Sequence, residues 1–296
     1  MDALDLIQDV RVRNRRGILL ATMGILIISP DGLLLRLAGD AGLWEAAFIR
    51  TLAMGVGLSS ILLAWHRWAL PTELVRLGWG GMASILLLSL SNIAFVAAMA
   101  ETTVANTLVI FAATPLFGAV LGRLFIGETV HSATWLAIAV AISGIGLIVG
   151  NSYGGLAAGS REGDAIALLT AILIAANLVV LRRFPHVDAT IALGLSGFAS
   201  AAFCWPHVEL AGMSPHSIAI LAFLGGIIIP LSLSLYFRSL RYLPAAEVAL
   251  FALIETVLGP MWAWVGVGET PGVSTLIGGA VVVGAIVLNG LGAVRR

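Results

Sequence analysis

Apolar residues fill most of the chain in long runs that are separated by short polar breaks. A bilayer core about 30 Å thick is crossed by a helix of roughly 20 apolar residues, and runs of this length recur along the whole sequence. The pattern therefore predicts an all-α polytopic membrane protein with little mass outside the bilayer. Its ten predicted transmembrane helices are residues 17–38, 43–65, 77–99, 102–124, 132–150, 163–182, 187–208, 216–237, 244–267 and 272–293.

Composition agrees with this fold class and narrows the function. Apolar residues make up 59% of the 296 residues, charged residues make up 11%, and the mean hydropathy is +1.04. The 16 acidic residues balance the 16 basic ones, so charge gives no reason to expect a nucleic-acid partner. The partners we expect are the lipid bilayer and a small-molecule substrate.

The sequence contains no recognisable enzyme motif. Every basic residue is arginine, and the missing lysine excludes a Walker phosphate loop and Schiff-base chemistry. The five histidines show no ligand spacing, and Cys204 has no second cysteine to pair with. We expect a protein that is not an enzyme and that holds no cofactor and no metal.

Arginine positions predict the orientation in the membrane, because short positively charged loops remain in the cytoplasm. With both termini in the cytoplasm, residues 1–16 form a cytoplasmic segment, and Arg36, Arg50 and Arg161 lie on or near the outer side. The arginines then assigned to the cytoplasmic side are Arg11, Arg13, Arg15, Arg16, Arg67, Arg76, Arg123, Arg182, Arg183, Arg238, Arg241, Arg295 and Arg296.

Two segments of the first half recur in the second half. GETVHSATWLAIAVAISGIGLIV from residue 127 resembles GETPGVSTLIGGAVVVGAIVLN from residue 268, and DGLLLR from residue 31 resembles NLVVLR from residue 177. A linker at residues 151–162 would separate two five-helix repeats, at residues 17–150 and 163–296. Because five is odd, the second repeat must have inverted topology, an arrangement typical of secondary transporters with a midplane substrate site.

These repeated segments carry a family resemblance. TPLFGAVLGRLFIGET at the end of the fourth predicted helix and ETVLGPMWAWVGVGET at the end of the ninth resemble the drug/metabolite transporter superfamily in its EamA branch. YddG-type bacterial exporters of amino acids are the nearest functional model. Ser29 opens the stretch SPDG, where many members show a tryptophan, small residues and an asparagine, so Ser29 joins the candidate site residues.

The resemblance implies a carrier in the bacterial cytoplasmic (inner) membrane. Such a carrier exports small metabolites by alternating access, and amino acids with aromatic or bulky apolar side chains are the first expectation. A multidrug or cationic xenobiotic exporter of the same fold is the alternative. A channel is less favoured, because the sequence shows neither a ring of like charges nor a repeated filter loop. Proton-coupled and passive transport both stay open, as do a monomer and a homodimer.

Glu255 is the most informative polar residue within a predicted helix. An acidic side chain at a helix centre costs on the order of 2.5 kcal/mol or more in a bilayer, so it must face water or a partner. The repeat offset of 141 residues pairs Glu255 with Thr114. We expect both to line a central cavity; a protonated Glu255 that bonds a neighbouring helix is the structural alternative.

Asp31 and Arg50 are a second pair of charges within the membrane. The predicted topology puts both at a similar depth on the first two helices, where they could form an ion pair. A structural ion pair is one interpretation. The other is an outer gate or a contact for a substrate carboxylate.

Neutral polar and aromatic side chains complete the candidate set. Asn92, Asn177 and Tyr236 offer hydrogen bonds suited to a zwitterion, although inter-helix bonds, or for Tyr236 a place at the cytoplasmic interface, would also explain them. Phe111 and Phe251, together with Phe95, could stack on an apolar or aromatic substrate, and the alternative is ordinary packing. Prolines at 30, 115, 230 and 260 are expected to remove a backbone donor inside a helix and free a carbonyl, which is tolerated beside cavities or neighbouring helices. Gly118 and Gly122, like Gly146 and Gly150, have the spacing of bundle contacts or of a dimer face.

Overall fold

The protein folds entirely into helices in a computed structural model that describes residues 3–66, 77–127, 132–151, 160–239, 242–243 and 245–294. In the part before residue 160, the helices are α1 (Ala3–Ile28), α2 (Asp31–Leu37), α3 (Leu43–His66), α5 (Gly78–Glu101), α6 (Val104–Ala112), α7 (Thr114–Ile126) and α8 (Ser132–Asn151). In the part after it, they are α9 (Arg161–Arg183), α10 (Ala189–Cys204), η1 (Trp205–His207), η2 (Leu210–Gly212), α11 (Pro215–Phe223), η3 (Leu224–Ile228), α12 (Ile229–Ser239), α13 (Ala245–Val267) and α14 (Val273–Val294).

The predicted ten membrane-spanning helices are confirmed. Seven stretches are long and apolar enough to cross a bilayer, and shorter apolar helices lie within α8, α13 and α14. Four of the seven combine consecutive elements: α1 with α2, α6 with α7, α10 with η1, and α11 with η3 and α12. The outward faces suit lipid, since Phe125, Val265 and Leu288 are each more than 70% exposed. Most of the predicted linker at 151–162, like the Glu-Thr of the motif that begins at Gly127, lies outside the described residues.

Two of the predicted continuous helices are broken at a proline. Pro30 separates α1 from α2, and Pro115 follows the break between α6 and α7 at Ala113. A proline has no N–H for the carbonyl four residues earlier. At both breaks the preceding residue replaces that donor: the Ser29 hydroxyl donates to the Leu26 carbonyl at 2.9 Å and the Thr114 hydroxyl to the Phe111 carbonyl at 2.5 Å.

The other two prolines behave differently. Pro230 follows the π-helical turn η3, whose i→i+5 hydrogen bonds widen the helix just before the proline. Pro260 lies inside α13, as expected, and removes one backbone donor without ending the helix. The first residue of each Gly-Glu-Thr motif has a clear role. Gly127 and Gly268 have φ of 70° and 71°, the left-handed conformation that ends α7 and α13.

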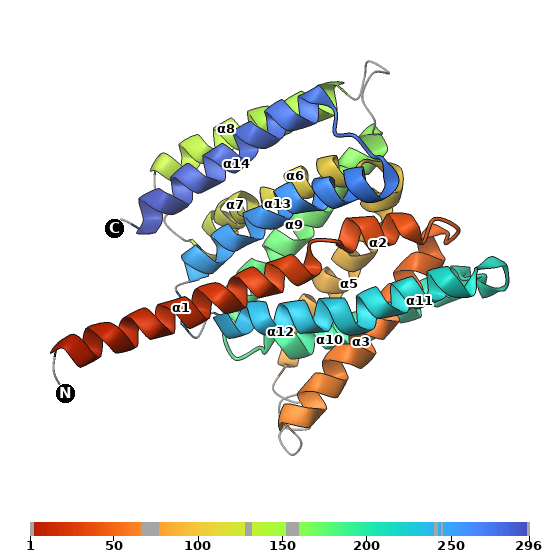
Figure 1. The fold of residues 1–296 in the computed structure, drawn as a ribbon, viewed down its shortest axis with the longest axis horizontal. Helices are drawn as coiled ribbons and strands as arrows, with labels where there is room; N and C mark the ends of the chain where they lie inside the picture. The colour runs from red at the N-terminus through yellow and green to blue at the C-terminus, as the bar shows by residue number, and fades with distance from the viewer. Residues whose placement is uncertain are drawn as a thin grey trace.

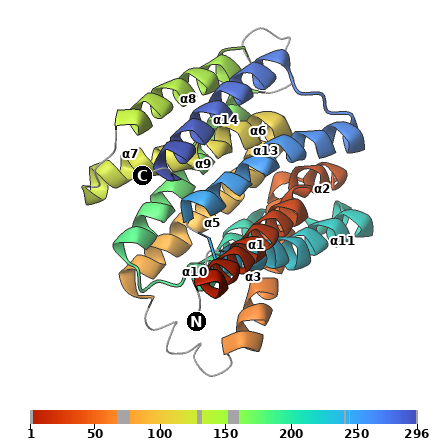
Figure 2. The same cartoon turned by 60° about the vertical axis from the view of Figure 1, so that its left-hand side comes forward.

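The two halves of the chain are interleaved in space. The most extensive helix contacts join α5 to α9, α3 to α10, α8 to α14 and α1 to α12, and each pair takes one helix from each half. Figures 1 and 2 both show α8 and α14 side by side. Exchanging the halves turns the α5–α9 pair into the α12–α1 pair, and it maps the other two pairs onto themselves. This is the contact pattern that a duplicated five-helix unit produces.

Gly144 and Gly278, and not the expected Gly146 and Gly150, allow α8 and α14 to approach closely. A Cβ on Gly144 would lie 2.8 Å from the Gly278 carbonyl, and one on Gly278 would lie 2.6 Å from the Gly144 carbonyl. Gly146 and Gly150 are exposed on another face of α8 and would have open space beside a Cβ. The predicted bundle contact of Gly146 and Gly150 is therefore wrong, and their alternative role in a dimer face stays a prediction.

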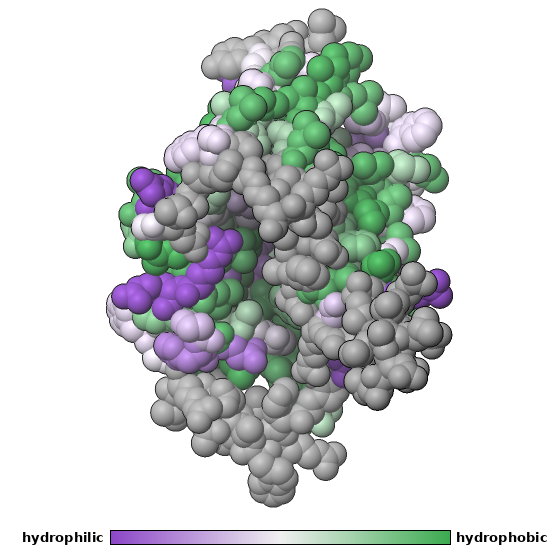
Figure 3. Space-filling view, turned by 90° about the vertical axis from the view of Figure 1, so that its left-hand side faces the viewer, coloured by the Kyte–Doolittle hydropathy of each residue, from purple (hydrophilic) through white to green (hydrophobic). Residues whose placement is uncertain are grey.

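The helices α1 and α14 respectively begin and end at the same end of the bundle, on the left in Figure 1. We call this the terminal end and the opposite one the distal end, which carries residues 38–42, 102–103, 205–214 and 268–272. Figure 3 looks at the terminal end, where hydrophilic residues gather at the left of the face and apolar residues cover much of its upper and right-hand parts.

Candidate functional site

The predicted pair of charges inside the membrane is present. Arg50 Nη2 on α3 donates to Asp31 Oδ2 at the start of α2 over 2.7 Å, and the two side chains are only 7% and 5% exposed. The break at Pro30 lets α2 begin at Asp31, inside the first span, which ends at Leu37. A buried ion pair costs so much desolvation that its partners must hold each other closely.

Glu255 joins this pair. It lies on α13, and its carboxylate interacts electrostatically with both Asp31 and Arg50. Its side chain is partly exposed although it lies within the span, and its charged neighbours place it toward the bundle interior. We call Asp31, Arg50 and Glu255 the charged cluster; it contains two carboxylates and one guanidinium and draws on both halves of the chain.

Aromatic side chains border the charged cluster. The Arg50 guanidinium lies over the ring of Phe95 on α5, 5.4 Å from its centroid. The ring of Phe111 on α6 meets Phe95 edge to face, with 5.9 Å between centroids. A cation over a ring face is attracted by the ring quadrupole. Both phenylalanines are only partly buried, so part of this aromatic surface is accessible.

Tyr236 lies within electrostatic range of Glu255, three residues before the end of α12. Its hydroxyl on α12 donates to the Val248 carbonyl on α13 over 3.1 Å, and it interacts electrostatically with Glu255. Phe251 lies one helical turn before Glu255 on α13, and residues four apart share a helix face. Tyr236 and Phe251 are thus placed on the side of α13 that carries Glu255.

The other candidates have partners outside the charged cluster. Ser29 accepts a hydrogen bond from Trp262 Nε1 at 2.9 Å while it donates to Leu26, and Thr114 at the start of α7 donates to the Phe111 carbonyl of α6. Asn92 donates to Ser196 at 3.3 Å, which joins α5 to α10, and Asn177 accepts from Ser84 at 2.6 Å, which joins α9 to α5. These bonds are those of helix packing, and the expectation that Thr114 and Glu255 line one central cavity stays a prediction.

A second group of polar contacts lies at the distal end. Arg36 Nε on α2 forms an ion pair with Glu269 Oε2 in the α13–α14 connection at 2.8 Å, and its Nη2 donates to the Thr102 carbonyl at 2.5 Å. Glu269 Oε1 also accepts from the Val104 backbone N–H at the start of α6, at 2.6 Å. One carboxylate thereby holds three elements together.

Behind this ion pair, Asp164 at the start of α9 is fully buried. Its Oδ1 accepts from the Thr102 hydroxyl at 2.7 Å and from Asn106 Nδ2 at 3.0 Å. Asn106 Oδ1 in turn accepts from the Thr275 hydroxyl on α14 at 2.5 Å. The distal network therefore crosses between the halves more than once; its members are Arg36, Thr102, Asn106, Asp164, Glu269 and Thr275.

Sequence reasoning missed the distal network. Two signals pointed toward it: Glu269 belongs to the repeated Gly-Glu-Thr motif, and Arg36 ends the repeated segment that begins at Asp31. Neither signal identifies a partner, because the contact joins residues that are 233 positions apart.

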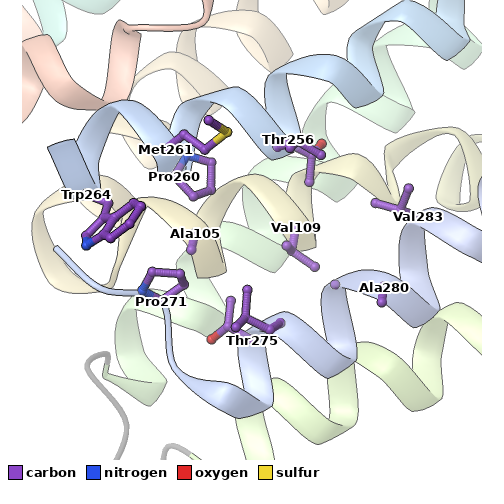
Figure 4. A pocket seen from close by; sticks show the side chains of 13 residues that line it. Ala105, Val109, Thr256, Pro260, Met261, Trp264, Pro271, Thr275, Ala280 and Val283 are labelled. Atoms are coloured by element: carbon purple, nitrogen blue, oxygen red, sulfur yellow. The ribbon is translucent and has the colours of Figure 1, made fainter.

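An apolar cavity of about 300 Å³ lies between α6, α13 and α14 (Figure 4). It opens to the surface past Val257, Met261, Trp264 and Leu276, which are each 50–59% exposed. Its polar side chains are Thr256 and Thr275, and no member of the charged cluster lines it. The cavity suits hydrocarbon better than a polar metabolite. Among the residues described, no group of three His, Cys, Asp or Glu side chains could hold a metal ion.

Comparison with known proteins assigns the chain to a family. No curated protein sequence matches it. A solved structure described only as a crystal structure of a protein is similar, with a TM-score of 0.63 and 18% identity over 94% of this chain and 97% of that one, and this likeness concerns the fold alone. The EamA-like transporter family matches residues 15–150 and again residues 161–291, close to the two five-helix halves. The chain belongs to the EamA-like transporter family, and it is a multi-pass, non-enzymatic membrane transporter of small molecules.

Proposed function

We propose that this transporter exports small metabolites by alternating access, and that its main substrates are amino acids with aromatic or bulky apolar side chains. The charged cluster is the observation that carries the proposal. Asp31 and Arg50 form a buried ion pair inside the bundle, and Glu255 of the other half interacts electrostatically with both. Ionisable side chains within a membrane span are costly, so they generally mark a functional site. The accessible edges of Phe95 and Phe111 beside them suit an apolar side chain.

The distal network supports the alternating-access part of the proposal. It ties α2 and α6 to the α13–α14 connection, so it would have to open for the charged cluster to reach the distal side. The arginine distribution predicts that both termini are cytoplasmic, and in that orientation the distal end is the outer face. We therefore interpret this conformation as one that is closed to the outside.

A cation exporter is the second candidate, and one observation favours it. The cluster holds two carboxylates against one guanidinium, so when all three are ionised it carries net negative charge. A cationic substrate would balance that charge without a carboxylate of its own.

Counterflow in proteoliposomes tests both candidates. Vesicles loaded with an unlabelled amino acid should accumulate the same labelled amino acid transiently and saturably, and a panel of amino acids and organic cations ranks the substrates. Repeating the assay with a pH gradient tests proton coupling. Accumulation of cations but of no amino acid would favour the second candidate, and flux that does not saturate would indicate a channel.

A further inference from the structure

The Asp31–Arg50 pair uses only part of its hydrogen-bonding capacity. A guanidinium and a carboxylate can form two parallel hydrogen bonds, but here a single one joins Arg50 Nη2 to Asp31 Oδ2. Among the residues that the structure describes, Arg50 Nε and Asp31 Oδ1 are buried and have no hydrogen-bond partner. The pair therefore leaves one cationic donor and one anionic acceptor unused.

Unused polar atoms at this depth need an explanation, because buried donors and acceptors are nearly always paired. The Phe95 ring covers one face of the guanidinium, and the Nε–H bond lies in the guanidinium plane, where a partner would have to approach. The second carboxylate, that of Glu255, lies within electrostatic range of both members of the pair. The free donor and the free acceptor are thus held on one rigid unit beside a partly accessible aromatic surface.

We infer that Arg50 Nε and Asp31 Oδ1 bind the head group of a zwitterionic substrate. The substrate carboxylate accepts from Arg50 Nε, and the substrate ammonium donates to Asp31 Oδ1 with the Glu255 carboxylate nearby. This inference rests on the proposed transport function and adds the two atoms that would bind the head group of the substrate. An amine without a carboxylate leaves Nε unpaired, and an acid without an ammonium meets two carboxylates, so both should bind more weakly.

The geometry also assigns the side-chain position. Phe95 and Phe111 meet edge to face beside the guanidinium, so a substrate held at the free atoms of the pair has its side chain next to these rings. Rings of this kind prefer offset or edge contacts with another aromatic group. Phenylalanine is therefore the probe that matches both parts of the site.

A series of three ligands tests the inference on the full-length wild-type protein. Phenylalanine, phenethylamine and 3-phenylpropanoate share one side chain and differ in the head group. Titrated against purified protein in nanodiscs, phenylalanine should bind at least about tenfold more tightly than either analogue, since a hydrogen bond to a charged group is worth that factor or more. Phenethylamine binding as tightly as phenylalanine would overturn the inference and leave cation transport standing.

Variants separate the two ends of the head group. Asp31→Asn keeps an acceptor for Arg50 but removes the negative charge, so the preference for phenylalanine over 3-phenylpropanoate should fall to about threefold or less. The preference over phenethylamine should remain at about tenfold. Phe95→Leu is the matched control: it should weaken phenylalanine binding and keep both head-group preferences. Equal losses of both preferences in Asp31→Asn would contradict the inference, and so would the absence of phenylalanine and leucine binding to the wild type. In either case, counterflow of another solute would show that transport itself is intact.

Discussion

Arg36 and Glu269 form an ion pair across the two halves of the protein, with 2.8 Å between Nε and Oε2. Arg36 is near the end of α2 in the first half, and Glu269 follows the left-handed Gly268 that ends α13 in the second. The side chains are 26% and 16% exposed, so water reaches the pair and an isolated contact of this kind would be weak. Both side chains also form hydrogen bonds with backbone groups, Arg36 with the Thr102 carbonyl and Glu269 with the Val104 N–H, and these bonds strengthen the contact.

Asp164 should be important for stability because it is fully buried behind this pair. Asp164→Asn removes the charge that the Thr102 hydroxyl and Asn106 stabilise, and hydrogen bonds to charged groups contribute about 1.5–3 kcal/mol each. We expect the free energy of unfolding to fall by about 1–3 kcal/mol, measured by denaturant titration in detergent. Glu162→Gln, an exposed position in the same first turn of α9, is the control. Equal stability of the two variants would contradict this role.

The hydroxyl of Thr114 should stabilise the break between α6 and α7. Thr114→Val keeps the shape of the side chain but leaves the Phe111 carbonyl without the donor that replaces the N–H missing at Pro115. The expected loss is about 1 kcal/mol, and Thr114→Ser should recover most of it. Thermal unfolding of the three proteins measures the difference. If serine is no better than valine, the bond has no stabilising role.

Asp40 gives a pH dependence whose sign follows from its contacts. Hydrogen bonds from the Ser217 hydroxyl and the Ser214 backbone N–H lower the pKa of this carboxyl from 3.8 to about 2. Because the pKa is lower in the folded state, the stabilisation is complete above about pH 4 and is lost as the pH falls through 2. The difference in melting temperature between the wild type and Asp40→Asn should thus be constant from pH 5 to 8 and shrink below pH 4. A difference that changes between pH 6 and 8 would contradict this assignment.

Glu255→Gln should separate function from folding. Glutamine has nearly the same size, so the bundle should fold, while the cluster loses the carboxylate that interacts with Asp31 and Arg50. We expect counterflow to slow at least about tenfold or to change its dependence on pH. Glu101→Gln, at an exposed position in the last turn of α5, should behave as the wild type. Unchanged transport by Glu255→Gln at every pH would remove this residue from the mechanism.

The ten spans and the duplicated architecture could be predicted from sequence, because the length of an apolar run and a repeated motif are local properties. The Asp31–Arg50 pair could be predicted for the same reason, since two charges at one depth on neighbouring spans need each other. The breaks at Pro30 and Pro115 were harder to predict. Proline marks an interruption, but only the structure shows that Ser29 and Thr114 are used to satisfy the freed carbonyls.

Contacts between distant parts of the chain could not be predicted. Nothing local in the sequence indicates that Arg36 meets Glu269, or that Phe95 lies under Arg50. Asn92 and Asn177 were expected as ligand groups or as inter-helix bonds, and the structure gives them inter-helix partners. Which polar side chain faces a neighbour depends on helix rotation, which apolar periodicity does not fix when almost every position is apolar.

Cross-linking the distal end is the most direct test of alternating access around the charged cluster. Arg36→Cys and Glu269→Cys would be combined with Cys204→Ala, joined by a short bifunctional thiol reagent, and assayed by counterflow of phenylalanine in proteoliposomes. The account predicts that cross-linking abolishes counterflow, that a cleavable linker restores it on reduction, and that the single-cysteine proteins are unaffected. Full counterflow through completely cross-linked protein would contradict it, because the distal end would then not need to open.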